Sequence, residues 1–246
     1  MEHLRTSSVL KSEDADVIRS CECAIELMKL TQQKVIDHAK FYAGQALRPR
    51  LATTNVRELL FTKCRRIMSS LQDSDLVKVS YRVDDCVAKY IVTDGGYLWE
   101  SVVNFLSNAL KFTQKGTIDC SVYKITPERL RFEVRDTGIG IPYARKGDLF
   151  QQFSQLQSFG RGSGLGLWGV RQKITALGGE VGAHDNAGNG SVFYFDIPYR
   201  PDFMLEQARL DRGSGATPCD IEEGEHGSDE NRRMNSRCLW WIIDPG

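Results

Sequence analysis

Long apolar runs are missing from this sequence of 246 residues. None approaches the roughly 20 residues that a membrane-spanning helix needs, so we expect no membrane segment, and no signal peptide is visible. An excess of one sign of charge is also missing, because 32 Lys and Arg residues balance 32 Asp and Glu residues. Dispersed and balanced charge argues against a nucleic-acid-binding surface. Composition therefore favours a soluble, cytoplasmic enzyme.

Cysteine patterns that mark metal or redox sites are absent too. The seven cysteines form no C-x-x-C pair, and none has a histidine at the spacing of a zinc ligand. Reduced thiols are the expected state of such cysteines in the cytosol. The sequence therefore argues against a zinc site and against a disulfide framework.

A polar face on an amphipathic helix is the first candidate site. Residues 97–112 are predicted to be a helix because apolar side chains recur there at helical spacing. Asn104, Asn108 and Lys111 lie at i, i+4 and i+7, so they share one face. Carboxamide oxygens suit Mg²⁺, and an ammonium group suits a phosphate. For such a pattern alone, a solvated polar face is the alternative.

A carboxylate at a strand end is the second candidate. Apolar and charged residues alternate from Leu130 to Arg135, which predicts a strand with one buried face that ends at Asp136. In the sequence DTGIGIP, Gly138 and Gly140 let the backbone turn sharply and lie close to a ligand. A buried carboxylate needs hydrogen-bond donors. A ligand can provide them, and so can the backbone of the carboxylate's own turn.

Glycines that precede a helix form the third motif, GRGSGLGL, at residues 160–167. Gly162, Gly164 and Gly166 lead into a helix predicted over residues 167–177. The backbone N–H groups and the positive dipole end at such a junction attract anions. A flexible linker is the alternative for glycines at this spacing alone.

In this order along the chain, the three motifs resemble those of the ATP-binding catalytic domain of a sensor histidine kinase. That domain belongs to a superfamily shared with DNA gyrase, Hsp90-type chaperones and mismatch-repair ATPases. The resemblance covers roughly residues 15–201 and is strongest from Asp94 onward. It implies an α/β fold, a two-layer sandwich with helices on one face of a mixed sheet and ATP between the helix layer and a lid. A helical, partial dimerisation segment would precede this sandwich.

The resemblance implies a role for each motif residue. Asn108 would ligate Mg²⁺, Asn104 would assist at the metal or its waters, and Lys111 would contact phosphate. Asn104 and Lys111 are therefore the expected catalytic residues. Asp136 would accept the adenine amino group, with Ser191 beside the adenine pocket. The full set expected to bind ATP is Asn104, Asn108, Lys111, Phe112, Asp136, Gly138, Gly140, Ile141, Phe150, Gly162, Ser163, Gly164, Leu165, Gly166, Leu167 and Ser191.

Residues 143–161 resemble the ATP lid of this family. Leu149, Phe150 and Phe153 lie there among polar residues and glycines. A segment that buries so little apolar surface of its own is expected to be mobile. The two phenylalanines would anchor the lid to the domain or dock it on partner helices, unless they are ordinary core residues.

The chain divides into four predicted stretches. Residues 1–50 are a partial helical dimerisation segment, and residues 51–201 are the ATP-binding catalytic domain. Residues 202–237 are an acidic linker that is expected to be disordered. Residues 238–246 are an apolar tail, and their sequence CLWWIID resembles the first strand of a response-regulator receiver domain. A hybrid kinase would continue in this way, and a simple apolar tail is the alternative.

Local patterns predict the elements around the motifs. Residues 15–42 are predicted to be a helix with an apolar seam suited to a bundle or a dimer. The seam consists of Ile18, Cys21, Ile25, Met28, Gln32, Val35, Ala39 and Tyr42. Residues 44–54 are a connector, and Asn55 then caps a helix that ends at Leu71, supported by Glu58. Strands are predicted at residues 76–83, 87–93 and 190–198.

The acceptor histidine is the main departure from the family. His226 is in the acidic linker, His184 is near a predicted strand end, and His38 is on the predicted dimerisation helix, where the family has no acceptor. Only His3, in EHLRTS, resembles the family pattern His-acid-Leu-Arg-Thr-Pro, with the first two residues exchanged and Ser in place of Pro. The acceptor therefore stays unassigned, and the first dimerisation helix is expected to be absent or degenerate.

The resemblance implies a histidine kinase of a two-component phosphorelay. It would bind Mg-ATP, form a homodimer through its N-terminal helices, phosphorylate a histidine and pass the phosphate to a receiver domain. A non-catalytic ATP-binding or dimerising module is the first alternative, favoured by the missing acceptor motif. An ATP-hydrolysing relative is the second. It is disfavoured because Asn104 occupies the position where such relatives place a glutamate base, and Glu100, one turn earlier, is expected to point elsewhere.

Overall fold

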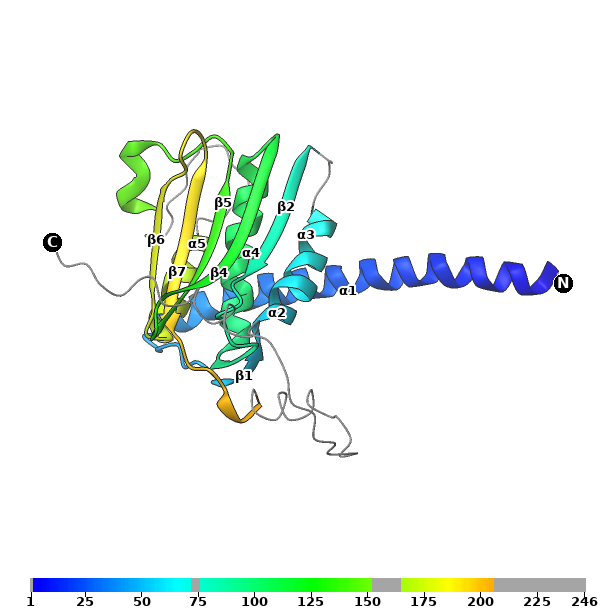
Figure 1. Cartoon of the computed structure of the whole chain (residues 1–246), viewed down its shortest axis with the longest axis horizontal. Helices are drawn as coiled ribbons and strands as arrows, with labels where there is room; N and C mark the ends of the chain where they lie inside the picture. Colours follow the sequence, from blue (N-terminus) through cyan, green and yellow to red (C-terminus); the bar gives the residue numbers. More distant parts are fainter. Residues whose placement is uncertain (1, 72–75, 152–164, 206–246) are drawn as a thin grey trace, which may run out of the picture. The chain divides into compact units, whose positions relative to one another are not determined.

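Two β-sheets and a layer of helices make up the described part of the chain. The computed structural model describes residues 2–71, 76–151 and 165–205. In chain order it holds helix α1, strand β1, helices α2, η1 and α3, strands β2 and β3, helix α4, strands β4 and β5, helices η2 and α5, and strands β6 and β7 (Figure 1).

The larger sheet has five strands in the order β2-β4-β5-β7-β6. Its strands are β2 (Val77–Val83), β4 (Gly116–Thr126), β5 (Arg129–Asp136), β6 (Glu180–Asp185) and β7 (Ser191–Pro198). Strand β2 runs parallel to β4, and all other neighbours are antiparallel. The sheet is therefore mixed, as predicted, and the strand predicted to end at Asp136 is confirmed.

One face of this sheet is covered by the helices α3 (Arg65–Leu71), α4 (Gly95–Phe112) and α5 (Gly166–Ala176), as Figure 1 shows. The ring centre of Phe105 on α4 lies 5.5 Å from that of Phe193 on β7. Alternate side chains of β4 and β5 complete the core: Ile118, Cys120, Val122, Leu130, Phe132 and Val134. The predicted two-layer α/β sandwich is confirmed.

The opposite face of the large sheet carries charged and polar pairs. Arg131 donates to both carboxylate oxygens of Asp196, at 2.7 and 2.8 Å. The Tyr123 hydroxyl donates to Glu133 at 2.8 Å. Because these cross-strand pairs satisfy the polar groups of this face, it needs no second helix layer.

A smaller sheet fixes the start of α4. Strand β1 (Ala52–Asn55) pairs antiparallel with β3 (Tyr90–Thr93), and α4 follows β3 after one residue. A Cβ at Gly95 would lie 2.9 Å from the Thr54 Oγ1, so the first residue of α4 packs closely on β1. The predicted connector at residues 44–54 therefore ends in a strand, and the strand predicted at residues 87–93 is shorter.

The helix predicted after Asn55 forms, but its middle is wider than an α-helix. The Asn55 side chain accepts a hydrogen bond from the Glu58 N–H at 3.2 Å, as the capping prediction required. Helix α2 (Val56–Glu58) then passes into a π-helix, η1 (Leu59–Cys64), before α3 begins. Apolar spacing alone does not reveal such a π-helical turn.

Helix α1 (Glu2–Tyr42) is longer than the helix predicted from residue 15. Its C-terminal part contacts α3 and α5, and Leu30 is buried there. The predicted seam faces away from this contact, since Ile25, Met28 and Val35 are 50%, 69% and 65% exposed. Within the described ranges, the apolar seam therefore has no covering element.

Several predictions concern residues outside those described, namely the acidic linker from residue 206 onward and the apolar tail at residues 238–246. The described start of the linker is held to β1, because the Thr53 hydroxyl donates to Asp202 at 2.5 Å. In the described ranges, no helix has both the length and the apolar character needed to cross a membrane.

Candidate functional site

Helix α4 carries the predicted asparagine face. The helix is capped by Asp94, whose Oδ1 accepts a hydrogen bond from the Tyr97 N–H at 3.0 Å. The apolar face of α4 packs into the core, which sets the direction of the polar face. Asn104 is buried, Asn108 is half-buried and Lys111 is exposed. The three side chains thus become more accessible toward the C-terminal end of the helix.

The Asn104 side chain links α4 to the glycine motif. Its Nδ2 donates to the Glu100 carbonyl oxygen at 2.8 Å, so the amide nitrogen is held by the helix itself. A Cβ at Gly166 would lie 3.0 Å from the Asn104 Oδ1. The first residue of α5 therefore approaches the carboxamide oxygen closely, and the first and third motifs meet here.

Asp136 is buried at the end of β5. Its Oδ1 accepts hydrogen bonds from the Gly138 N–H at 2.8 Å and the Ser191 N–H at 3.2 Å. Burial raises the pKa of this carboxyl above its ordinary value, and the two hydrogen bonds oppose that rise. Among the described residues, no donor reaches Oδ2. Backbone donors, which the sequence offered as the alternative to a ligand, therefore satisfy one carboxylate oxygen. The other oxygen is left for a donor from elsewhere.

The glycines of the DTGIGIP segment bring the second motif to the end of α4. A Cβ at Gly138 would lie 2.4 Å from the Phe112 carbonyl oxygen, so a larger residue would displace the backbone. The Ile139 N–H donates to the same oxygen at 3.2 Å. Gly140 has a φ of +74°, a conformation that favours glycine. The Lys111 Nζ lies at this end of α4 too, 5.1 Å from the Phe112 ring centre.

Two residues that support Asp136 were missed by the sequence motifs. The Asn186 Nδ2 donates to the Asp136 carbonyl oxygen at 2.8 Å. Gly190 has a φ of +98°, and a Cβ there would lie 2.0 Å from the same oxygen. Both residues belong to the turn NAGNG between β6 and β7. Such a turn signals a hairpin, but no local pattern reveals which distant residue it touches.

The remaining predicted site residues lie around this centre or outside the described ranges. Ile141 is a buried residue of the DTGIGIP segment, and a 3-10 helix, η2 (Tyr143–Asp148), follows this segment. The Phe150 ring centre lies 6.4 Å from that of Phe193, and Leu149 is buried beside it. For Phe150 the described contact is therefore core packing. Leu165 and Leu167 flank the start of α5, whereas Phe153, Gly162, Ser163 and Gly164 lie outside the described residues.

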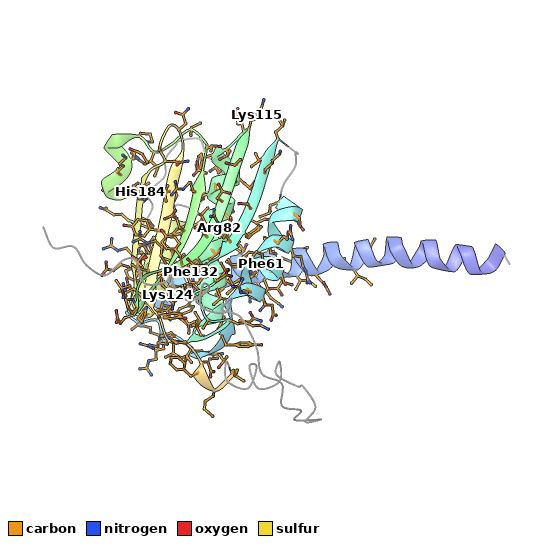
Figure 2. All side chains as sticks on the ribbon, viewed as in Figure 1. Phe61, Arg82, Lys115, Lys124, Phe132 and His184 are labelled. Carbon is orange, nitrogen blue, oxygen red and sulfur yellow. The ribbon has the colours of Figure 1, made fainter. Side chains whose placement is uncertain are left out.

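Asp136, the DTGIGIP turn and the C-terminal end of α4 lie at one end of the large sheet. Figure 2 labels Lys115 and Lys124 at opposite ends of β4, with Phe132 between them on β5. Strand β5 is antiparallel to β4 and pairs Asp136 with Ile118, so Asp136 lies at the Lys115 end. The C-terminal end of α4 reaches the same place through its contact with the DTGIGIP turn. The site is therefore built at this end of the sandwich.

Comparison with known proteins places the same region in a family. Residues 93–201 match the family described as histidine kinase-, DNA gyrase B-, and HSP90-like ATPases. The signal transduction histidine-protein kinase BarA of Escherichia coli is 30% identical over 70% of this chain and 20% of BarA. The sensory/regulatory protein RpfC of Xanthomonas campestris is 27% identical over 88% of this chain and 31% of RpfC. The chain thus spans less than a third of the length of these relatives.

Solved structures agree with the sequence relatives. The crystal structure of full-length ShkA in complex with AMPPNP has a TM-score of 0.61 and 30% identity, over 72% of this chain and 36% of ShkA. A nucleotide-free catalytic domain of the histidine kinase ThkA has the same fold, with a TM-score of 0.53 and 23% identity over 61% of this chain and 95% of that domain. Residues 93–201 therefore form a domain of the histidine kinase-, DNA gyrase B- and HSP90-like ATPase family, of the same type as the catalytic domains of sensor histidine kinases.

Proposed function

We propose that this chain is a histidine kinase of a two-component phosphorelay, which binds Mg-ATP and transfers its γ-phosphoryl group to a histidine. The observation that carries the proposal is the convergence of the three motifs. Gly166 approaches the Asn104 carboxamide, and Gly138 packs against the Phe112 carbonyl at the C-terminal end of the same helix. Segments far apart in the sequence thus meet around α4, and the histidine kinases among the relatives support this reading.

Adenine recognition fits the environment of Asp136. Its Oδ1 is occupied by two backbone N–H groups, while its Oδ2 accepts from no described donor. An adenine amino group would supply that donor, and a charge-assisted hydrogen bond of this kind stabilises binding by about 1.5–3 kcal/mol. The Ser191 N–H holds the carboxylate through its Oδ1, and the buried Ile141 of the same segment would supply an apolar contact to the base.

The polar face of α4 fits a magnesium nucleotide. Asn104 has its amide nitrogen fixed to Glu100, so the group it can turn to a metal or its waters is the oxygen. Asn108, half-buried one turn later, would ligate Mg²⁺ through its carboxamide oxygen, a ligand type that this ion accepts. Bound Mg²⁺ would neutralise charge on the phosphates. Lys111 would contact a phosphate, and the glycine motif would offer backbone N–H groups.

Hydrolysis of ATP by this site is disfavoured by two observations. The position one turn before Asn108 holds Asn104, and a carboxamide cannot take a proton from water at neutral pH. Glu100 is buried one further turn away, and its carboxylate lies 3.0 Å from the Lys173 ammonium. It therefore serves an internal ion pair and is not aimed at an attacking water, as the sequence predicted.

The acceptor histidine would come from another helix or another chain. His3 lies on α1, the same continuous helix as Asp37, and at a rise of 1.5 Å per residue they are roughly 50 Å apart. His38 packs against Trp168, and the exposed His184 has its Nδ1 3.0 Å from a neighbouring carbonyl oxygen. We therefore assign none of these three as the acceptor within its own domain.

Partners and location follow from this proposal. The exposed seam of α1 would pair with a second copy of the chain, because an apolar stripe at heptad spacing is stabilised by another helix. The phosphate would then pass from the histidine to a receiver aspartate. We place the reaction in the cytoplasm, where the free Cys64 and Cys120 would stay reduced.

Radiolabelled ATP tests the proposal. The chain should bind a fluorescent ATP analogue yet label itself poorly, and it should transfer label to an intact dimerisation domain that is supplied in trans. Acid treatment identifies the product, because phosphohistidine is acid-labile, and Asn108→Ala is the inactive control. Binding without transfer in either case would favour a non-catalytic ATP-binding module. Strong acid-labile labelling of the chain alone, lost in His3→Gln, would instead make His3 the acceptor.

A further inference from the structure

A buried ion triad joins three helices outside the sequence motifs. Lys173 of α5 is 3% exposed, and its Nζ lies 2.6 Å from the Asp37 Oδ2 of α1 and 3.0 Å from the Glu100 Oε2 of α4. Asp37 and Glu100 are themselves only 6% and 8% exposed. Among the described residues, no donor other than Lys173 reaches either of these two oxygens. These two buried oxygens therefore depend on one ammonium group.

The surroundings of the triad are poorly solvated. Burial raises the pKa of the Glu100 carboxyl, and the nearby Lys173 opposes that rise. Burial also lowers the pKa of Lys34 on α1, which Lys173 lowers further. The Gln33 Nε2 completes the shell by donating to the Asp37 Oδ1 at 2.6 Å. In such a place an uncompensated charge is costly, so the three ions hold one another in position.

An aromatic contact lies beside the triad on the same two helices. The Trp168 ring centre lies 4.8 Å from that of Phe41 and 5.8 Å from that of His38. Trp168 belongs to the first turn of α5, directly after the glycine motif. The C-terminal part of α1 therefore packs against the same helix that begins at the proposed phosphate site.

The triad is connected to the nucleotide motifs through one hydrogen bond and one helix. The Glu100 carbonyl oxygen holds the Asn104 Nδ2, and the Asn104 Oδ1 faces Gly166. Lys173 lies two turns after Gly166 on the same helix. The contact between Lys173 and Glu100 therefore joins the two helices whose motif residues would meet the phosphates. The contact with Asp37 adds α1 to the same unit.

We infer that Lys173 is a positioning residue that couples the docking of α1 to the nucleotide site. It sets α4 and α5 at the spacing that nucleotide binding requires, and it does so while α1 is docked through Asp37. The inference rests on the proposed binding of ATP. Because coupling between two sites is reciprocal, nucleotide should tighten the docking of α1, and loss of the triad should weaken nucleotide binding.

A set of variants separates positioning from simple stabilisation. Lys173→Met removes the ammonium and leaves two buried carboxylates. The triple variant Asp37→Leu/Glu100→Leu/Lys173→Met replaces all three ions with apolar groups, an exchange that is often neutral for stability or favourable. Glu100→Gln keeps the side-chain shape and an oxygen for Lys173. Arg171→Met is the matched control, because Arg171 is an exposed cation on the same helix.

Two readouts are needed, namely the affinity for a fluorescent ATP analogue and the hydrogen exchange of the amides of residues 30–42 with and without AMPPNP. In the wild type and Arg171→Met, nucleotide should slow this exchange. In the triple variant the affinity should fall about tenfold, and exchange in residues 30–42 should no longer respond to nucleotide, while thermal stability is kept. Glu100→Gln should lose affinity about fivefold, a smaller effect at the low end of the range of allosteric coupling.

The outcomes distinguish this inference from the proposed function. A folded triple variant, or Glu100→Gln, with wild-type affinity and a wild-type exchange response would overturn the positioning role of Lys173. A wild-type chain that fails to bind the analogue would instead refute the proposed function. Glu100→Gln preserves the test if Lys173→Met and the triple variant do not fold.

Discussion

Helices α4 and α1 both carry apolar residues at helical spacing, but they meet very different surroundings. The apolar side of α4 is covered within the chain, where Phe105 packs against Phe193 in the core. The apolar seam of α1 is exposed, and α1 contacts the domain mainly through Leu30, Asp37 and a few aromatic side chains. Periodicity therefore identifies a face that needs a partner, but not whether that partner is in the same domain. In α4 the partner is the sheet, whereas for α1 we propose a second helix.

The largest expected effect is the loss of stability when the core contact of α4 is removed. Phe105→Ala should lower the free energy of unfolding by about 3–5 kcal/mol, because it leaves a cavity between α4 and the sheet. Met28→Ala, at an exposed position of the α1 seam, is the control and should change it by less than about 0.5 kcal/mol at a concentration that keeps the chain monomeric. Urea denaturation followed by circular dichroism measures both. Similar losses in the two variants would show that the seam is covered within the chain.

The next effect concerns the polar face of α4. Asn108→Ala should reduce phosphotransfer to a dimerisation domain by at least about 100-fold, because a misplaced Mg²⁺ forfeits several kcal/mol of charge stabilisation. Binding of nucleotide without metal should persist. Ser107→Ala, a neighbouring polar residue whose hydroxyl donates to the Asn104 carbonyl within the helix, is the control and should keep activity. Normal phosphotransfer by Asn108→Ala would remove the metal role from this residue.

A smaller effect, on ATP affinity, is expected from a change of Asp136 at the end of β5. Asp136→Asn should weaken ATP binding about ten- to 100-fold, since the adenine amino group loses a charged acceptor. The variant should not destabilise the nucleotide-free chain at pH 7. Burial raises the folded pKa of this carboxyl, so its contribution to stability is present below the unfolded pKa and is lost as pH rises through the folded pKa.

Two measurements check this expectation for Asp136. Fluorescent-analogue titration gives the affinity, and thermal unfolding from pH 4 to pH 8 gives the stability difference between wild type and variant. The difference should favour the variant increasingly as pH rises. Unchanged affinity would contradict the adenine assignment, and a variant that is less stable at pH 7 would contradict the dominance of burial at this carboxyl.

The motif-bearing elements could be predicted from the sequence because each is a local pattern. The helix predicted at residues 97–112 is observed at Gly95–Phe112, and the one predicted at residues 167–177 is observed at Gly166–Ala176. The strand ending at Asp136 was predictable for the same reason, since alternation specifies a half-buried strand. The meeting of these elements was implied by a family resemblance, and no local pattern specified it.

The contacts that sequence reasoning missed are long-range and involve ordinary residue types. Asp37, Glu100 and Lys173 each resemble a solvated charge on a helix, and only the packing of three helices buries them together. Asn186 has the same character, because a turn asparagine does not indicate that it holds the Asp136 carbonyl. Burial of a polar group depends on the neighbours that folding brings, so such contacts require the structure.

The smallest effect on nucleotide affinity is expected from changes in the seam of α1. These changes also test most directly whether the apolar faces of α1 and α4 have different partners. The double variant Ile25→Glu/Val35→Glu places like charges on an exposed apolar stripe, where they would repel one another across a helix–helix interface. Sedimentation should show a dimer for the wild type and a monomer for the variant. Nucleotide affinity should stay within about twofold, because surface changes away from the site have little effect.

Lys29→Glu changes an exposed charge outside the seam and should leave the dimer intact. A variant that remains dimeric would place the interface elsewhere, and a wild type that is monomeric at high concentration would leave the seam for another partner.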